Sequence, residues 1–143
     1  MTVDLQALHE RIGEFGDRAF LVTVGDDGRP HVVSVHVGAD GDRLVVAAGR
    51  RTTANVTARP GVTLLWPSPV SPAGAIEPGE SDCGDPTDSP GHAEDYGLIV
   101  DGAGELVDAD PPAVAIRPTA AVLHRLADTA GDGPACVPVL PRP

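Results

Sequence analysis

Lysine is missing from this sequence: all ten basic residues are arginines, and twenty-one acidic residues give the 143-residue chain a formal net charge of −11. Nonspecific binding to nucleic acids requires a basic face that neutralises phosphates, and anionic membrane surfaces attract clusters of basic residues. The composition therefore argues against both kinds of partner. The arginines are unevenly distributed, since seven lie in residues 1–66 and three in residues 67–143.

Aromatic residues and cysteines are also scarce. Aromatic residues make up 3% of the chain, so its core must be built from Val, Leu, Ile and Ala. Cys83 and Cys136 could pair in an oxidising compartment, but we interpret them as two unrelated thiols of a cytoplasmic protein. No apolar run approaches membrane-spanning length, and the polar N-terminus does not resemble a signal peptide. We therefore expect one cytoplasmic domain over residues 1–143, with no membrane or nucleic-acid partner.

Sequence motifs for several enzyme classes are absent as well. The chain contains no G-x-S-x-G, H-E-x-x-H or G-x-x-x-x-G-K-[ST] segment, so readings as a hydrolase, a zinc protease or a nucleoside triphosphatase have no support. Cys83 and His92 lie among acidic residues, but metal binding would need more ligands at closer spacing. We expect no metal site.

Hydrophobic patterning predicts mostly strands. Leu5, Leu8, Ile12 and Phe15 recur at helical spacing and predict an N-terminal amphipathic helix. Strands separated by turn residues are predicted at 19–24, 31–37, 43–48, 62–66, 96–108 and 113–126. The fifth strand is expected to kink at 102–104, and Pro118 indicates an edge or a bulge in the sixth.

Two further segments complete the expected fold. A short crossover helix is predicted at 52–59, with Thr52 or Thr53 as its N-cap and Pro60 after its end. Residues 67–95 contain six prolines, four glycines and seven acidic residues but no basic residue, so we expect a long surface loop. The Pro- and Gly-rich tail is expected to lie along the surface. Six strands and two helices fit a small antiparallel barrel.

The order of these segments resembles the pyridoxamine 5′-phosphate oxidase-like family, the flavin-binding split barrels. The resemblance covers roughly residues 5–126 apart from the acidic loop, and "DGRPHVVSV" and "GRRTTANVTARPGV" are its most specific parts. It implies a mostly β fold, a six-stranded antiparallel split barrel with an N-terminal helix and a short crossover helix. It also implies a homodimer with two cofactor sites at the subunit interface.

The resemblance assigns candidate cofactor-binding residues to two segments. The end of the third strand and the start of the next helix would hold the phosphate of flavin mononucleotide (FMN), and the middle of the second strand would line the flavin ring. The candidates are Ser34, Val35 and His36 on the second strand, and Ala48, Gly49, Arg50, Arg51, Thr52 and Thr53 after the third. A proton-donating role for His36 stays open beside that of an interface histidine, and no catalytic residue is assigned.

The "GRRTT" stretch has two interpretations. A helix N-terminus with two arginines is an anion site, because its first N–H groups have no intrahelical acceptor. Alternatively, it is a capped helix beside two solvated arginines. The family context favours the phosphate site.

Three functions stay open at this stage. The first is an FMN-dependent oxidoreductase acting on a small organic substrate. The second is a deazaflavin-dependent reductase on the same fold, against which the net charge of −11 counts, because that cofactor carries an acidic tail. The third is a non-catalytic module that binds flavin or haem. The sequence lacks the second-strand arginine and lysine of the true oxidases and has Thr52 in place of the usual phosphate-binding lysine, so a role in the pyridoxine pathway is not expected.

Overall fold

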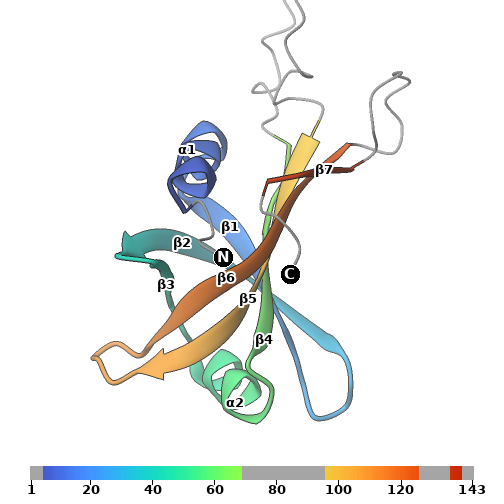
Figure 1. Cartoon of the computed structure of the whole chain (residues 1–143). Helices are drawn as coiled ribbons and strands as arrows, with labels where there is room; N and C mark the ends of the chain where they lie inside the picture. Colours follow the sequence, from blue (N-terminus) through green and yellow to red (C-terminus); the bar gives the residue numbers. More distant parts are fainter. Residues whose placement is uncertain (1–4, 69–95, 126–135, 140–143) are drawn as a thin grey trace, which may run out of the picture.

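The computed structural model describes residues 5–68, 96–125 and 136–139, which form a closed antiparallel barrel with two helices (Figure 1). In chain order the elements are α1 (Leu5–Phe15), β1 (Arg18–Val24), β2 (Pro30–Asp40), β3 (Arg43–Ala47), α2 (Arg50–Ala58), β4 (Gly61–Trp66), β5 (Tyr96–Val107), β6 (Ala113–Arg125) and β7 (Cys136–Pro138). The strand order is β3-β2-β1-β4-β5-β6, and pairing of β3 with β6 closes the barrel. The predicted mostly β, six-stranded antiparallel barrel with an N-terminal and a crossover helix is confirmed.

Alternation of side chains along each strand builds the core. On β1, Ala19, Leu21 and Thr23 are buried, whereas Arg18, Phe20 and Val24 on the other face are exposed. This alternation is the period of a strand with one face on the core. Buried leucine, valine and isoleucine from β3, β4, β5 and β6 fill the rest of the interior, as the shortage of aromatic residues requires.

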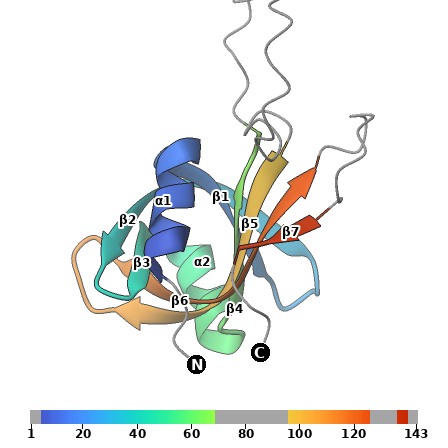
Figure 2. The ribbon, with the colours of Figure 1, turned by 45° about the horizontal axis from the view of Figure 1, so that its top comes forward.

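Helix α1 precedes β1, and α2 contacts β1 near its end; Figure 2 shows α1 above α2 in that view. At the start of β1, Leu8 of α1 is fully buried, and the indole Nε1 of Trp66 donates to the carbonyl oxygen of Gly16 just after α1, at 2.9 Å. At the end of β1, Asn55 of α2 contacts Thr23. The lone tryptophan is therefore a structural residue at a strand end.

The predicted start of the crossover helix is wrong. Helix α2 begins at Arg50 with Gly49 as its N-cap, and neither Thr52 nor Thr53 caps it. Thr52 is 2% exposed because it faces the barrel, and the Thr53 hydroxyl donates to the Gly49 carbonyl oxygen at 2.9 Å within the first turn. Both threonine side chains are thus used inside the helix, and both arginines belong to its first turn.

Strand boundaries and the irregularity in the β5–β6 pair also differ from expectation. β2 continues to Asp40, so the turn after it contains only Gly41 and Asp42. Asp101 pairs with Ala120 but Gly102 pairs with Pro118, so Thr119 is the additional residue of a bulge. The bulge predicted from Pro118 is confirmed, and Pro118 itself pairs only with β5, because the β3 pairing ends at Ile116 and the β7 pairing begins at Val122.

The C-terminal part contains a strand that the sequence did not predict. β7 pairs with β6 outside the closed barrel, where we expected a surface tail. The loop predicted at 67–95 lies outside the described residues apart from Pro67 and Ser68, and Ser68 is 9% exposed.

Candidate functional site

A cavity of about 750 Å³ lies between the start of α2 and the β1–β2 turn. We call it the arginine pocket; it is lined by Gly25, Asp26, Asp27, Arg29, Pro30, His31, Arg50, Arg51, Ala54 and Asn55. Its volume is within the range of roughly 300–1,000 Å³ that small-molecule sites occupy. Three arginines and two aspartates are among the lining residues, although the chain as a whole is strongly acidic.

The first turn of α2 presents Arg50 and Arg51 to this pocket, which Asp26 and Asp27 also line. The first intrahelical bond runs from the Thr53 N–H to the Gly49 carbonyl at 2.9 Å, so the N–H groups of residues 50–52 have no acceptor within the helix. No side chain caps the helix, and no acidic residue lies in its first turn. Within residues 5–68, 96–125 and 136–139, no carboxylate pairs with Arg50 or Arg51. Such an arrangement attracts anions.

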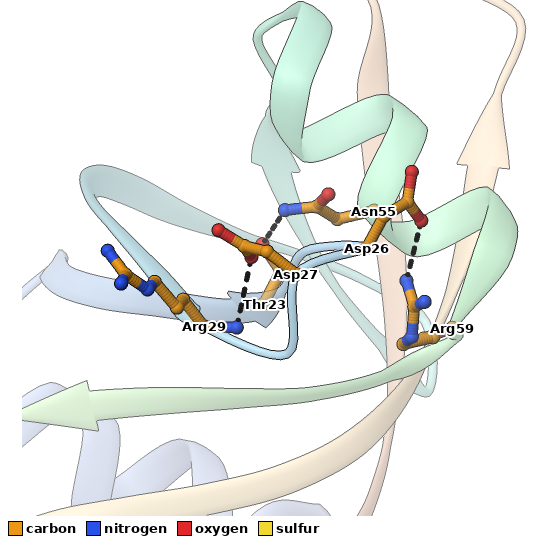
Figure 3. Close-up of polar contacts among 6 residues, drawn as sticks. All are labelled: Thr23, Asp26, Asp27, Arg29, Asn55 and Arg59. Carbon is orange, nitrogen blue, oxygen red and sulfur yellow. Dashed lines mark hydrogen bonds and ion pairs between the residues drawn. The ribbon is translucent and has the colours of Figure 1, made fainter.

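Two polar contacts attach α2 to β1 and to the turn that follows it (Figure 3). The Asn55 Nδ2 donates to the Thr23 Oγ1 at 3.0 Å, with both residues buried. The Arg59 Nη1 lies 3.1 Å from the Asp26 Oδ1 at the surface. The buried bond is the stronger constraint, because exposed ion pairs contribute little. Together they fix where the first turn of α2 lies relative to the β1–β2 turn.

The β1–β2 turn forms the other wall of the pocket. The Gly25 N–H donates to the Arg29 carbonyl oxygen and the Gly28 N–H to the Gly25 carbonyl oxygen, each at 2.9 Å. The Arg29 N–H donates to the Asp27 Oδ1 at 3.0 Å, a contact typical of aspartate in tight turns. Gly28 has a φ of 75°, which a side chain would disfavour. The turn thereby places Arg29 in the same pocket as Arg50 and Arg51.

A second cavity of about 400 Å³ lies over β1 on the outside of the barrel. We call it the strand pocket; it is lined by Arg18, Ala19, Phe20, Ser34, Val35, His36 and Pro67. The His36 Nδ1 lies 3.4 Å from the Asp17 Oδ2, and both side chains are mostly exposed, so this contact is weak. Ser34 and His36 point out of the barrel, as the alternation along β2 predicts.

Comparison with known proteins shows to which family the chain belongs. No family model matches the sequence. The uncharacterized proteins Mb0449c of Mycobacterium bovis and MT0457 of Mycobacterium tuberculosis are each 36% identical to this chain over 146 residues, covering 92% of this chain and 85% of each relative. The chain belongs to their family.

Similar solved structures identify the fold. A protein from Clostridium acetobutylicum related to general stress protein 26, of the pyridoxinephosphate oxidase family, matches with a TM-score of 0.56 and 12% identity over 85% of this chain and 87% of that one. HutZ, the heme storage protein of Vibrio cholerae, matches with a TM-score of 0.51 and 15% identity over 82% and 91%. A heme-binding protein of Mycobacterium smegmatis matches with a TM-score of 0.56 and 14% identity over 97% and 60%. The fold is the pyridoxamine 5′-phosphate oxidase-like split barrel.

The split barrel separates the predicted site residues into groups. Arg50 and Arg51 line the arginine pocket, whereas Ser34, Val35 and His36 line the strand pocket. Ala48, Gly49, Thr52 and Thr53 line neither of these two pockets. Ala48 is buried, and its N–H donates to the Pro112 carbonyl oxygen at 3.0 Å. Thr52 is also buried, so its hydroxyl is not accessible to a ligand. Its backbone N–H, in the first turn of α2, is the group that could still bind an anion.

Sequence reasoning missed five polar residues of the arginine pocket, namely Asp26, Asp27, Arg29, His31 and Asn55. Asp27 and Arg29 lie in the "DGRPHVVSV" segment but are not among the candidate residues, and neither is Asn55. A signal for Asn55 existed, because it follows Arg51 by four residues on one face of a helix. No comparable signal linked Arg29 to Arg51, since their proximity comes from the tertiary packing of α2 on β1.

Metal and membrane features do not add to this picture. Within the described part of the chain, no three His, Cys, Asp or Glu side chains gather as a metal site would require. Cys83 and His92 lie outside it. Neither α1 nor α2, the two helices in that part, is long and apolar enough to cross a membrane.

Proposed function

We propose that this split barrel is an FMN-dependent oxidoreductase that acts on a small organic substrate and binds the FMN phosphate in the arginine pocket. The observation that carries the proposal is the uncapped first turn of α2, with Arg50 and Arg51 free of carboxylate partners among the described residues. Arg29 adds a third guanidinium from the opposite wall. When bound, FMN would supply the hydride chemistry, while the protein supplies position and polarity.

The expected binding energy suits a phosphate monoester. A charge-assisted hydrogen bond contributes about 1.5–3 kcal/mol. Two or three such bonds from Arg50, Arg51 and Arg29 would account for much of a micromolar affinity, which corresponds to about 8 kcal/mol. The backbone N–H groups of residues 50–52 offer further donors. The residues present therefore fit the phosphate group.

The ring-binding part of the proposal requires a second protomer. His31 of the arginine pocket and Ser34 of the strand pocket are about 10 Å apart along β2 and lie on opposite faces of it. We therefore propose a homodimer in which the arginine pocket of one protomer combines with the outer β2 face of its partner.

Exposed apolar residues on the outer face support this homodimer. Val24 and Val32 are 37% and 53% exposed, and they project from the outer face of β1 and β2. Contiguous exposed apolar surface of this kind is typical of protein interfaces. A homodimer with two-fold symmetry would cover it on both protomers at once.

A comparison of two ligands tests the phosphate site. Arg51→Ala should weaken FMN binding by about 2 kcal/mol, roughly thirtyfold, but should change riboflavin binding much less, because riboflavin has no phosphate. Fluorescence quenching of each flavin measures both affinities. Arg117→Ala, which removes an exposed arginine that lines neither the arginine pocket nor the strand pocket, controls for the loss of one positive charge. Equal effects of Arg51→Ala on both ligands, or no effect on either, would contradict the proposal.

Haem binding is a second candidate, favoured by the likeness to HutZ and to the M. smegmatis protein. His36 is the residue of this chain that suits it, because a histidine whose Nδ1 faces a carboxylate keeps its Nε2 for iron. A deazaflavin in the arginine pocket is the third candidate. Mass spectrometry of the ligand released from the purified protein separates FMN, deazaflavin and haem.

A further inference from the structure

We propose that the strand pocket binds a small organic carboxylate, with Arg18 holding the carboxylate group and Phe20 and Pro67 contacting the apolar body of the ligand. This site is distinct from the arginine pocket, since the two cavities share no residue. It does not depend on a bound flavin for its existence.

Strand register brings the lining residues together. Arg18 lies opposite His36, and Phe20 lies opposite Ser34 on β2 and Leu65 on β4. Directly opposed side chains on one face of a sheet are about 4.5–5.5 Å apart at their Cβ atoms. Arg18, His36 and Ser34 therefore lie beside the exposed Phe20 on the outer face of the barrel.

The guanidinium of Arg18 is available to a ligand. Three other arginines, Arg11, Arg43 and Arg59, each pair with a carboxylate at 3.1 Å. Arg18 has no such partner among the residues that the structure describes, although Asp17 precedes it directly. The Asp17 carboxylate instead contacts His36, at 3.4 Å. Arg18 therefore lines the strand pocket without a carboxylate partner of its own.

The side chains that line the strand pocket indicate which class of ligand it would bind. A guanidinium presents a planar set of donors that matches a carboxylate with two parallel hydrogen bonds. Ser34 adds a hydroxyl and His36 an imidazole, each able to bond a second polar atom. Phe20, 38% exposed, and Pro67 offer apolar surface on which a ring or short aliphatic chain can pack. A volume of about 400 Å³ suits a molecule of that size.

The same pocket is a candidate for the substrate subsite of the proposed oxidoreductase, and this step alone rests on the proposed function. Ser34 and His36 are also expected to lie beside the flavin ring. A substrate must lie against the reacting ring for hydride transfer. Arg18 would then select organic acids as substrates by holding their carboxylate beside that ring.

Fluorine NMR of the flavin-free protein tests the site directly. We expect para-fluorobenzoate to bind the wild type in the millimolar range or tighter, and Arg18→Gln to weaken that binding at least tenfold. Arg117→Gln removes the same charge elsewhere and should stay within twofold of the wild type. The neutral para-fluorobenzamide should bind at least tenfold more weakly than the acid. Arg18→Lys, which keeps the charge but loses the planar pair of donors, should fall between the wild type and Arg18→Gln.

The results separate this site from the proposed function. Absence of para-fluorobenzoate binding, equal binding of acid and amide, or equal losses in Arg18→Gln and Arg117→Gln would each overturn the carboxylate site. Circular dichroism of each variant verifies the fold, and Arg18→Lys decides the question if Arg18→Gln does not fold. FMN binding with no carboxylate binding would leave the flavoprotein proposal standing. Carboxylate binding without FMN binding would support the carboxylate site and contradict the flavoprotein proposal.

Discussion

The contact between Asn55 and Thr23 is expected to contribute both to stability and to the position of the phosphate site. The Asn55 Nδ2 donates to the Thr23 Oγ1 at 3.0 Å, and the two residues are 7% and 1% exposed. Asn55→Ala leaves the buried Thr23 hydroxyl without this donor, which costs about 1–3 kcal/mol. We therefore expect a loss of about 2 kcal/mol in the free energy of unfolding. For a chain of this size that loss lowers Tm by roughly 6–8 °C.

The reverse substitution should cost less. Thr23→Val removes the hydroxyl while preserving the shape of the side chain, and the Asn55 amide can then turn toward the adjacent arginine pocket. We expect a loss of about 1 kcal/mol. The double variant Thr23→Val/Asn55→Ala should lose less than the sum of the single variants, with a coupling energy on the order of 1 kcal/mol.

Urea denaturation of the four proteins measures these differences. Strictly additive losses would show that the two side chains do not interact in solution, and the account of how α2 is anchored would be wrong. Thr23 lines neither pocket, so any effect of Thr23→Val on FMN binding must come from a change in the position of α2. Under the proposed function it should weaken FMN binding about threefold or more, while riboflavin binding changes little. An unchanged FMN affinity would mean that the bond does not position Arg50 and Arg51.

Three further predictions follow from separate features. Light scattering at micromolar concentration should give about twice the chain mass of 14.6 kDa, and a monomer would contradict the shared flavin site. Gly102→Ala should lower the free energy of unfolding by about 1–3 kcal/mol in urea denaturation, because its Cβ would lie 2.6 Å from the Ile116 Cγ2. Asp27→Asn should tighten FMN binding about threefold in fluorescence titrations, because it removes a negative charge from the arginine pocket. The asparagine side chain keeps an oxygen acceptor for the Arg29 N–H. Weaker FMN binding would mean that Asp27 itself contacts the ligand.

The sequence predicted the barrel because its signals are local. Alternation along β1 and the turn residues after it specify strand, turn and partner strand within about twenty residues. The start of α2 was misplaced for a physical reason: Thr52 and Thr53 resemble N-caps, but tertiary packing directs Thr52 into the barrel. β7 was missed because a strand of three residues carries too little alternation to detect, and its pairing with β6 supplies the stability.

Only the part of the candidate site that lies within one continuous segment of the sequence was predicted. Arg50 and Arg51 form a recognisable unit beside a helix start, and the structure places both in one pocket. Arg29 reaches the same pocket from a turn about twenty residues earlier, and no local pattern joins the two segments. Arg18 of the strand pocket was not considered, because its significance depends on lying opposite His36 in the strand register.

The two faces of α2 connect stability with the proposed phosphate site. Thr52, Asn55 and Val56 are buried against the barrel, whereas Arg50 and Arg51 in the same first turns are exposed. A helix of nine residues is too short to be stable alone in water. Its first turn, and with it the set of free N–H groups, therefore exists only because the barrel binds the opposite face. An anion at that turn should in return stabilise α2 against unfolding, since any ligand that binds only the folded state raises its stability. Binding of FMN and packing of Asn55 on Thr23 are thus expected to reinforce each other.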